Sequence, residues 1–374
     1  MEYNIVKYAD IGKVKSGKRL PKGEVVSELI SNNKYIRVRD ITGNMLNSKD
    51  VQYITDEASK KIKNYRVQTR DIIISVVGTV GSIAEIPHEL NGAYLTENCD
   101  NLLVDERICL KKYLKHYLIS QYGQEQVIAN TVGSTQPKLP IYGIENFDIV
   151  LPDINIQNKI VKILDAFDNK ILINNQINDN LYNLAVAIYN DSFKSSNQGN
   201  CSIGDYIIPK RGKNLLSRDA ILGDVPVIAG GLEPATYHNV ANTKAPVITI
   251  SASGANAGYI NLWHIPVWSS DSSYIDNDIT KSVYFWHVTL KTRQKEIFDA
   301  QTGSAQPHIY PQHIAELPIN KLNEDKILQY ERKVTPFFDM MGKNKKENKY
   351  LEQLRDTLLP KLMNGEIDLD KIEI

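Results

Sequence analysis

Features that mark several protein classes are scarce in this sequence of 374 residues. Only three cysteines occur, at positions 99, 109 and 201, and none belongs to a CxxC pair, which excludes a disulfide scaffold and a thiolate zinc site. No apolar run reaches the roughly eighteen residues that a membrane helix needs, and the N-terminus lacks the apolar core of a signal peptide. We therefore expect a cytoplasmic protein with no membrane partner.

Neither sign of charge is in excess. The sequence has 44 Lys and Arg residues against 44 Asp and Glu residues, so the formal net charge is zero. Because a nucleic-acid-binding domain is usually basic overall, this balance argues mildly against nucleic-acid binding unless positive charge is concentrated locally.

Signatures of catalysis are missing as well. An amino-methyltransferase needs an acidic or amide residue before Pro-Pro-aromatic, together with a Gly-rich cofactor loop, and no Pro-Pro pair occurs. Gly78-Thr-Val-Gly81 is neither a P-loop nor a dinucleotide fingerprint and is better interpreted as a turn after a strand. The seven histidines have no HExxH or other ligand spacing. We predict no catalytic residue and no metal site in this chain.

What the sequence does contain is an internal duplication. The clearest match is between Gly133-Ser-Thr-Gln-Pro-Lys-Leu139 and Gly303-Ser-Ala-Gln-Pro-His-Ile309, which begin 170 residues apart. Further matches occur in the same order along both halves. Ile11-Gly12 matches Ile203-Gly204, Gly17-Lys18 matches Gly212-Lys213, segment 71–78 matches 246–254, and segment 113–116 matches 284–287. Segment 24–69 has no obvious equal in 219–244. Ordered matches around unrelated segments indicate two similar mixed α/β domains, each of which recognises a different target.

A long amphipathic helix is predicted after each repeat. Residues 153–193 contain no glycine or proline, and their apolar residues alternate in steps of four and three, the heptad pattern of a coiled coil. The same pattern returns in 322–374, where Pro336 predicts that the helix starts or kinks near it. The apolar positions are Ile156, Ile160, Ile163, Phe167, Ile177, Leu181, Leu184 and Ile188 in the first helix, and Ile327, Tyr330, Val334, Phe337, Met341, Leu351, Leu358 and Leu362 in the second.

Neither helix can bury its apolar stripe alone, so we expect the two helices to pair. Each stripe is interrupted at mid-length by polar residues, Lys170 and Asn174 in the first helix and Asn344 and Asn348 in the second. In an antiparallel coiled coil these residues would meet near the centre, where a buried asparagine fixes the register. The alternative is that the helices are core or oligomerisation elements with no spacing role.

The predicted organisation is therefore α+β, with two mixed α/β domains that are each followed by a long helix. The segments are 1–152 for the first domain, 153–193 for the central helix, 194–200 for a polar linker, 201–321 for the second domain and 322–374 for the distal helix.

The C-terminal segment Leu351-Glu-Gln-Leu-Arg-Asp-Thr-Leu-Leu-Pro-Lys-Leu-Met-Asn-Gly-Glu-Ile-Asp-Leu369 resembles a known family. It is similar to the distal conserved helix of the specificity subunits of type I restriction-modification systems, which carries an LRDxLLPKLMxGEI signature. The GS-x-QP strings and the start of the first helix (Leu151, Pro152, Gln157, Lys159, Ile160) are similar to the family too, so the resemblance covers essentially the whole chain. The chain departs from the family at Ile156, where an acidic residue is common, and at 323–327, which lacks a clear QxxI string.

The resemblance implies that this is a non-catalytic subunit that reads DNA. Each domain would be a target-recognition domain for one half of a bipartite, asymmetric sequence in double-stranded DNA. The helix pair would set the spacer and dock two methyltransferase subunits, and restriction subunits would complete the complex. S-adenosylmethionine, ATP and Mg would belong to these partners, so we expect no cofactor in this chain.

The expected DNA contacts lie where positive charge and polar loop residues gather. The candidates are Lys13, Lys15, Lys18, Arg19 and Lys22 in the first domain, Lys210, Arg211 and Lys213 in the second, and the loop residues Ser134, Thr135, Gln136, Lys138, Ser304, Gln306 and His308. Glycines beside the basic residues let the backbone approach a phosphate. Because the GS-x-QP loops are alike, we expect them to contact phosphate or support the domain, whereas base reading should come from segments that differ, such as 30–70 and 230–244. A solvated surface is the alternative for each basic cluster.

Two further functions remain open at this point. One is a coiled-coil adaptor or oligomerisation protein that binds only proteins. The other is a self-contained DNA methyltransferase or nuclease, for which Pro152-Asp153 and Glu324-x-Lys326 are the available residues, although about 170 positions separate them.

Overall fold

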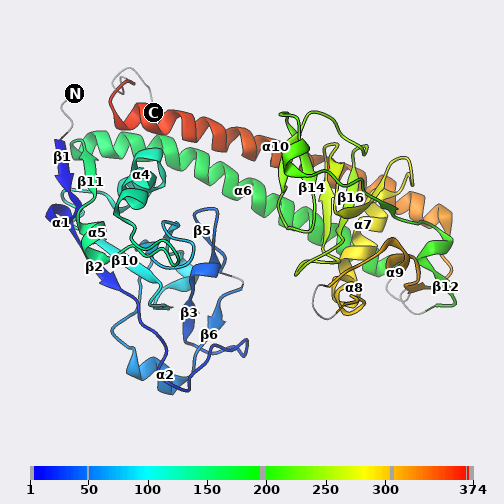
Figure 1. The fold of residues 1–374 in the computed structure, drawn as a ribbon, viewed down its shortest axis with the longest axis horizontal. Helices are drawn as coiled ribbons and strands as arrows, with labels where there is room; N and C mark the ends of the chain where they lie inside the picture. Colours follow the sequence, from blue (N-terminus) through cyan, green and yellow to red (C-terminus); the bar gives the residue numbers. More distant parts are fainter. Residues whose placement is uncertain (1–3, 49, 194–198, 304–306, 368, 370–374) are drawn as a thin grey trace. The chain divides into compact units, whose positions relative to one another are not determined.

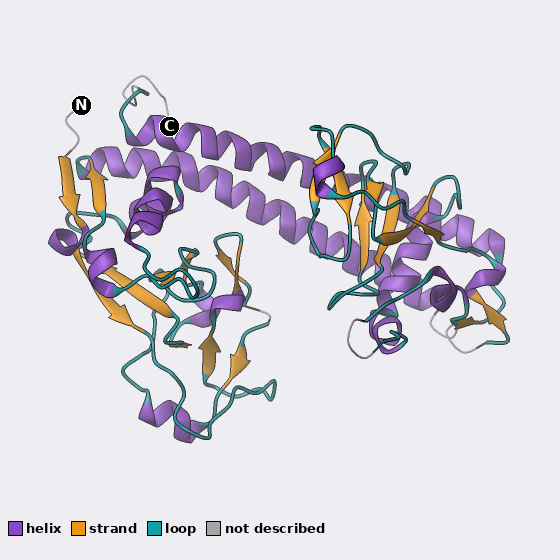
Figure 2. Ribbon diagram, in the orientation of Figure 1, coloured by secondary structure: helices purple, strands orange, loops and turns teal. Residues whose placement is uncertain are grey.

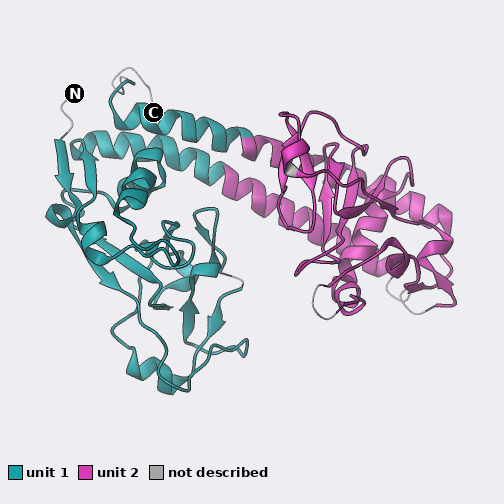
Figure 3. Ribbon diagram, in the orientation of Figure 1, with its two compact units in different colours: residues 1–170, 350–374 teal, residues 171–349 magenta. Residues whose placement is uncertain are grey.

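The computed structural model describes residues 4–48, 50–193, 199–303, 307–367 and 369. The chain forms two compact units, residues 1–170 with 350–374 (unit 1) and residues 171–349 (unit 2) (Figure 3). Two helices of 40 residues, α6 (Ile154–Phe193) and α10 (Glu324–Met363), each contribute to both units. Within the described residues, no helix combines the length and the apolar character needed to cross a bilayer.

Unit 1 is built around an antiparallel sheet in the order β2-β10-β7-β8 (Figures 1 and 2). Its strands are β2 (Gly12–Ser16), β10 (Cys99–Val104), β7 (Ile72–Ser75) and β8 (Ile83–Glu85). Every residue of β7 is buried, because each face of this strand meets a separate core. Ile72 and Ile74 pack with helix residues such as Tyr113 and Leu164, whereas Ile73 packs with Ile36 and other residues on the opposite face. An uninterrupted apolar run is therefore required here instead of the usual alternation.

Smaller elements complete unit 1. A second sheet, β6-β3-β9, pairs β3 with β9 in parallel, and β1 pairs with β11. The remaining strands are β1 (Asn4–Lys7), β3 (Lys34–Ile36), β4 (Ile41–Thr42), β5 (Met45–Leu46), β6 (Gln52–Tyr53), β9 (Tyr94–Leu95) and β11 (Asp148–Leu151). The helices are α1 (Tyr8–Ile11), α2 (Asp56–Lys61), α3 (Lys111–Ile119), α4 (Gln121–Asn130) and α5 (Ile141–Glu145).

Unit 2 repeats the topology of these three sheets, whereas the β4–β5 hairpin of unit 1 has no counterpart among the described strands of unit 2. Its antiparallel sheet has the order β13-β19-β16-β17, a second sheet β15-β14-β18 has one parallel pair, β14 with β18, and β12 pairs with β20. The strands are β12 (Cys201–Ser202), β13 (Lys210–Arg211), β14 (Val225–Ile228), β15 (Thr236–His238), β16 (Val247–Ser251), β17 (Ile260–Trp263), β18 (Trp268–Ser269), β19 (Ser272–Asp276) and β20 (Pro318–Ile319). The helices are α7 (Val283–Thr292), α8 (Gln294–Asp299) and α9 (Pro311–Ala315). Strand β16 has both faces buried, as β7 has. The duplication in the sequence is therefore a duplication of the fold.

The long helices begin close to their predicted positions, with one correction. Asp153 Oδ1 accepts hydrogen bonds from the backbone N–H groups of Asn155 (2.8 Å) and Ile156 (3.1 Å) and caps α6. Asn323 Oδ1 accepts one from Lys326 N (3.0 Å), so α10 starts at Glu324 and not at Pro336. The helix continues past Pro336, which is exposed, because its neighbours Val334 and Phe338 are both completely buried.

Within unit 1, an ion-pair network joins α6 to α10 and α3. Asp168 of α6 accepts a hydrogen bond from Arg355 of α10 (2.9 Å) and one from Lys115 of α3 (3.3 Å). Burial acts to raise the pKa of Asp168, but the charges of Lys115, His116 and Arg355 outweigh it, so the pKa lies below its usual range. A lowered pKa means that ionised Asp168 stabilises the folded unit.

This network gives the first testable prediction. Asp168→Asn should lower the free energy of unfolding at neutral pH by about 1–3 kcal/mol, because Arg355 and Lys115 lose a half-buried anionic partner. The stabilisation is present above the ordinary carboxyl pKa of about 4 and is lost as pH falls through the lowered pKa, so the difference from wild type should shrink in acid. Denaturant titrations at several pH values measure it.

Asp356→Asn is the matched control, because Asp356 bonds the same arginine (3.0 Å) but its side chain is 62% exposed. It should cost less than about 0.5 kcal/mol. Equal effects of the two substitutions, or a difference that does not depend on pH, would contradict the assignment.

Candidate nucleic-acid interface

In unit 1, a tight turn after the edge strand β2 presents the predicted lysines. Gly17 N donates a hydrogen bond to Cys99 O (3.0 Å) and Lys18 N donates one to Leu95 O (2.8 Å). A Cβ atom on Gly17 would lie 1.9 Å from Thr96 O, so only glycine lets the chain pass this close to the β9–β10 connection. The side chains of Lys15 and Lys18 on either side are exposed.

The same turn occurs in unit 2. Gly212 N donates to Ser272 O (2.8 Å), Lys213 N donates to Ser269 O (2.9 Å), and a Cβ on Gly212 would lie 2.5 Å from Ser269 O. Lys210 and Lys213 are exposed. The structural match therefore aligns Lys15 with Lys210 and Lys18 with Lys213, and we call residues 15–18 and 210–213 the K-x-G-K turns.

The other predicted basic residues differ in whether they have an acidic partner. Lys13 and Lys22 are exposed. Arg19 pairs with Glu97 (2.6 Å), although its side chain remains 81% exposed. Arg211 pairs with Asp271 (2.6 Å), which also accepts a hydrogen bond from Ser253 Oγ. The two arginines thus already have carboxylate partners, and these pairs could not be predicted from sequence because the partners lie 78 and 60 positions away.

The GS-x-QP loop of unit 1 is a short hairpin closed by backbone hydrogen bonds. In unit 1, Val132 N donates to Lys138 O (2.8 Å) and Lys138 N to Val132 O (2.9 Å), with Gly133 at φ 88°. Leu139 N then donates to Val76 O (2.9 Å) and anchors the hairpin beside the end of β7. Four predicted side chains are exposed on this hairpin, those of Ser134, Thr135, Gln136 and Lys138.

Unit 2 has the same closure, in which Thr302 N donates to His308 O (3.0 Å) and His308 N to Thr302 O (2.8 Å). His308 is half-buried and stacks on Tyr310, with 6.0 Å between ring centroids. Ser304 and Gln306 lie outside the described residues.

In each unit the K-x-G-K turn and the hairpin lie next to one another. In unit 1, Gly17 N donates to Cys99 O, Val76 N donates to the adjacent Asn98 O (2.8 Å), and Val76 O accepts from Leu139 N at the base of the hairpin. In unit 2 the connection is made by Arg211, Asp271 and Ser253, which forms a β-bridge with His308. Segments that lie 116 residues apart in unit 1 (Gly17 to Gly133) and 91 residues apart in unit 2 (Gly212 to Gly303) are therefore brought together in each unit.

The predicted register residues form a buried polar layer within unit 2, with one exception. Asn174 Nδ2 donates to Asn348 Oδ1 and Asn344 Nδ2 donates to Asn178 Oδ1, each at 2.8 Å. Residue numbers increase along α6 from Asn174 to Asn178 while those of the bonded partners in α10 decrease from Asn348 to Asn344, so the two segments are antiparallel. Lys170 is exposed, and the neighbouring Ile171 is buried in its place.

Asn178 was missed because the heptad phase taken from Ile177 and Leu184 is shifted by one position. Those two side chains are 40% and 47% exposed, whereas the next residues, Asn178 and Ala185, are buried. Apolar residues occupy several adjacent positions in this helix, for example 171–173, so its sequence alone fits two phases.

One cluster has the composition of a metal site, with ligand atoms of His116, Asp165 and Asp168 within 4.8 Å of one another. Each carboxylate is already paired, however. His116 Nε2 lies 3.0 Å from Asp165 Oδ1, Lys112 bonds the other oxygen of Asp165, and Asp168 is bonded by Lys115 and Arg355. Three cations and a histidine around two carboxylates do not favour a further cation, so we assign no metal here.

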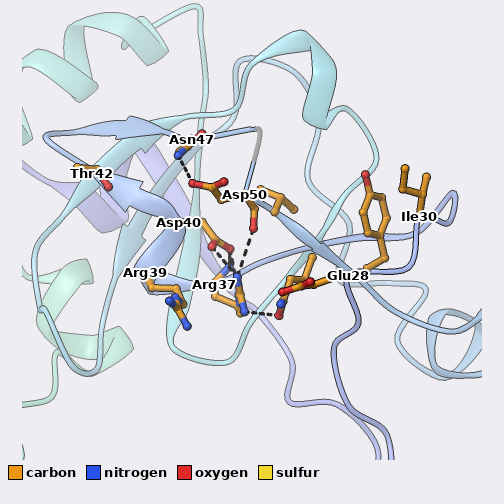
Figure 4. Close-up of a pocket in the computed structure, with 11 residues that line it drawn as sticks. Glu28, Ile30, Arg37, Arg39, Asp40, Thr42, Asn47 and Asp50 are labelled. Carbon is orange, nitrogen blue, oxygen red and sulfur yellow. Dashed lines mark hydrogen bonds and ion pairs between the residues drawn. The ribbon is translucent and has the colours of Figure 1, made fainter. Parts of the chain in front are cut away.

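A polar pocket of about 610 Å³ lies in segment 24–69, which includes the β4–β5 hairpin (Figure 4). The lining residues are Glu28, Ile30, Arg37, Arg39, Asp40, Thr42, Asn47, Asp50, Val51, Gln52 and Tyr53. The sequence indicated this region only as a range, because the pocket depends on how β3, the β4–β5 hairpin and β6 come together.

The sequence and the fold of this chain are similar to those of known proteins. Residues 1–183 match the family described as the type I restriction modification DNA specificity domain. The HindI type I restriction enzyme specificity subunit of Haemophilus influenzae is 23% identical over 87% of this chain and 93% of its own. The MjaIX type I restriction enzyme specificity subunit of Methanocaldococcus jannaschii is 20% identical over 99% of this chain and 95% of its own.

The crystal structure of a type I restriction-modification system S subunit from M. genitalium shares the fold, with a TM-score of 0.54 and 19% identity over 97% of this chain and 96% of that one. The family match over residues 1–183 and the relatives that span most of the chain make this chain similar to the specificity subunits of type I restriction-modification systems, and the M. genitalium S subunit shows the same fold.

Proposed function

We propose that each unit reads one half of a bipartite, asymmetric sequence in double-stranded DNA, and that the K-x-G-K turns and GS-x-QP hairpins grip the phosphate backbone. The observation that carries the proposal is that these two features recur side by side in both units, while the segments between them differ. Shared loops suit contacts that carry no sequence information, such as phosphate contacts. Differing segments suit base reading, which must change when the target changes.

We propose further that α6 and α10 pair as an antiparallel coiled coil that sets the unread spacer between the half-sites. The hydrogen bonds between Asn174 and Asn348 and between Asn344 and Asn178 support a defined register, because a one-heptad slip would leave buried amides unpaired. A helix of 40 residues is about 60 Å long, which exceeds one turn of B-DNA at about 34 Å.

The catalytic steps would belong to partner subunits. We propose that two methyltransferase subunits, which use S-adenosylmethionine, dock on the helices, and that restriction subunits, which use ATP and Mg, complete the complex in the cytoplasm. The target-recognition domains would be residues 1–152 and 201–321, with the helices at 153–193 and 322–374 and the linker at 194–200. An adaptor that binds only proteins is not favoured, because residues 1–183 match a DNA specificity domain and the relatives are specificity subunits of restriction enzymes.

The phosphate role of the turns gives a second prediction. Lys18→Ala and Lys213→Ala should each weaken binding to all DNA sequences alike, by several-fold, and reduce the slope of log affinity against log salt by about 1. Salt titrations of fluorescent duplexes with the chain bound to its methyltransferase subunits measure both quantities.

Lys295→Ala on α8 is the matched control, because Lys295 is exposed and lies outside the K-x-G-K turns. It should leave affinity and slope unchanged. If either turn variant altered which sequence is preferred, the lysine would be a base contact and the phosphate assignment would fail.

The spacer role gives a third prediction. A heptad inserted between Lys170 and Ile171, together with one between Lys349 and Tyr350, falls between the two units and keeps the contacts within each. It should lengthen the spacer by about 10 Å, or about three base pairs, and leave both half-sites unchanged. Methylation mapping of DNA from cells that carry the variant reads the spacer directly.

A heptad inserted into α10 alone is the control, because it puts the facing polar residues out of register and should abolish methylation. A double insertion that changed the half-site bases but kept the spacer would rule out the helices as the spacing element.

A further inference from the structure

The pocket in segment 24–69 is lined by two arginines, of which one forms several hydrogen bonds and the other forms none within the described residues. The guanidinium of Arg37 donates to both carboxylate oxygens of Asp40 (3.2 and 2.9 Å) and to Gln52 Oε1 and Asp50 O. These four bonds use most of its N–H donors, and the side chain is only 19% exposed. Arg37 therefore holds the wall of the pocket together and is not available for a ligand.

Arg39 has the opposite character. It is exposed, lines the same pocket, and within the described residues it has no hydrogen bond or ion pair (Figure 4). Its backbone is nevertheless held firmly. Asp40 Oδ2 accepts from Arg37 N (2.8 Å), Asp40 N donates to Arg37 O (3.0 Å), and Asn47 N donates to Asp40 O (2.9 Å). A rigid turn that presents one unsatisfied guanidinium is preorganised to bind a ligand.

The charges around Arg39 show which kind of ligand fits. Glu28 and Asp50 line the pocket and are exposed, and the carboxylate of Asp40 lies in its wall. These acidic groups would repel a phosphate. A base edge in the major groove presents both acceptors and donors, so it suits a site that combines a free guanidinium with carboxylate and amide groups such as those of Glu28 and Gln52.

We propose that Arg39 reads a guanine in the half-site recognised by unit 1, by donating two hydrogen bonds to guanine O6 and N7. The inference rests on the proposed function and adds the residue and the base to it. Arg37 acts only as a positioning residue, which keeps the turn at 37–40 in shape. The lysines of the K-x-G-K turns supply affinity, and Arg39 supplies discrimination.

The test uses the full chain in complex with its methyltransferase subunits and a panel of duplexes, each carrying one changed base pair in the target. Wild type should discriminate by about 10- to 100-fold against replacement of one particular guanine. Arg39→Ala should reduce that ratio to near one at this position, with every other position unchanged. Arg39→Lys should lose discrimination too, because an ammonium cannot form the two-pronged contact. Arg39→Gln should shift the preference from guanine to adenine, which glutamine bonds in the same way.

Three results would overturn the proposal. Arg39→Ala that weakens methylation of all duplexes equally, with recovery in Arg39→Lys, would make Arg39 a phosphate contact. An unchanged profile would remove it from the interface. An inactive Arg39→Ala together with Arg39→Gln that still prefers guanine would assign it a structural role. If wild type itself showed no sequence-selective methylation or binding, the proposed function would fail, and the panel separates that result from failure at Arg39 alone.

Discussion

The architecture of each unit depends on a central strand that is buried on both faces. In β7, Ile72 and Ile74 pack into one apolar core, and Ile73 packs into a second core on the opposite face of the strand. In β16, Ile248 and Ile250 likewise pack into one core and Val247 into another. Leaving either face in water would expose several large side chains, at a cost of about 1.5–3 kcal/mol each. Helices therefore cover one face and the smaller sheet covers the other, which leaves β2 and β13 as edge strands. The lysine-bearing turns project from those edges.

Polar groups in the long helices restrict how the helices can pair. The buried asparagines and the Asp168–Arg355 ion pair add little net stability compared with apolar residues of similar size, but misaligning them would leave amides or charges without partners. The apolar residues thus favour association, and the polar residues select one alignment from several. The proposed role in spacing would need that selectivity, because a shift of one heptad would change the distance by about 10 Å.

Much of this could be predicted from sequence where the signal is local or repeated. Gly17-Lys18 and Gly212-Lys213 belonged to ordered matches, and both form the same glycine-dependent turn. The lack of glycine and proline after Pro152 predicted the start of α6. Prediction from sequence failed where the local sequence was compatible with two different structures. The phase of α6 near Ile177 and Asn178 was decided by α10, and Pro336 remained inside α10 because buried neighbours hold the helix on both sides.

By itself, the sequence determined the duplicated frame, the two long helices and the positions of the basic turns, because glycine, proline and apolar spacing act on the chain over a few residues. Only the tertiary structure decided which charges are available. Arg211 is paired with a residue 60 positions away and Arg355 with one 187 positions away, whereas Arg39 is held in place with its guanidinium unpaired among the described residues. Whether a cation is paired depends on distances of a few ångströms between segments far apart in the chain, and those distances exist only after the cores have packed.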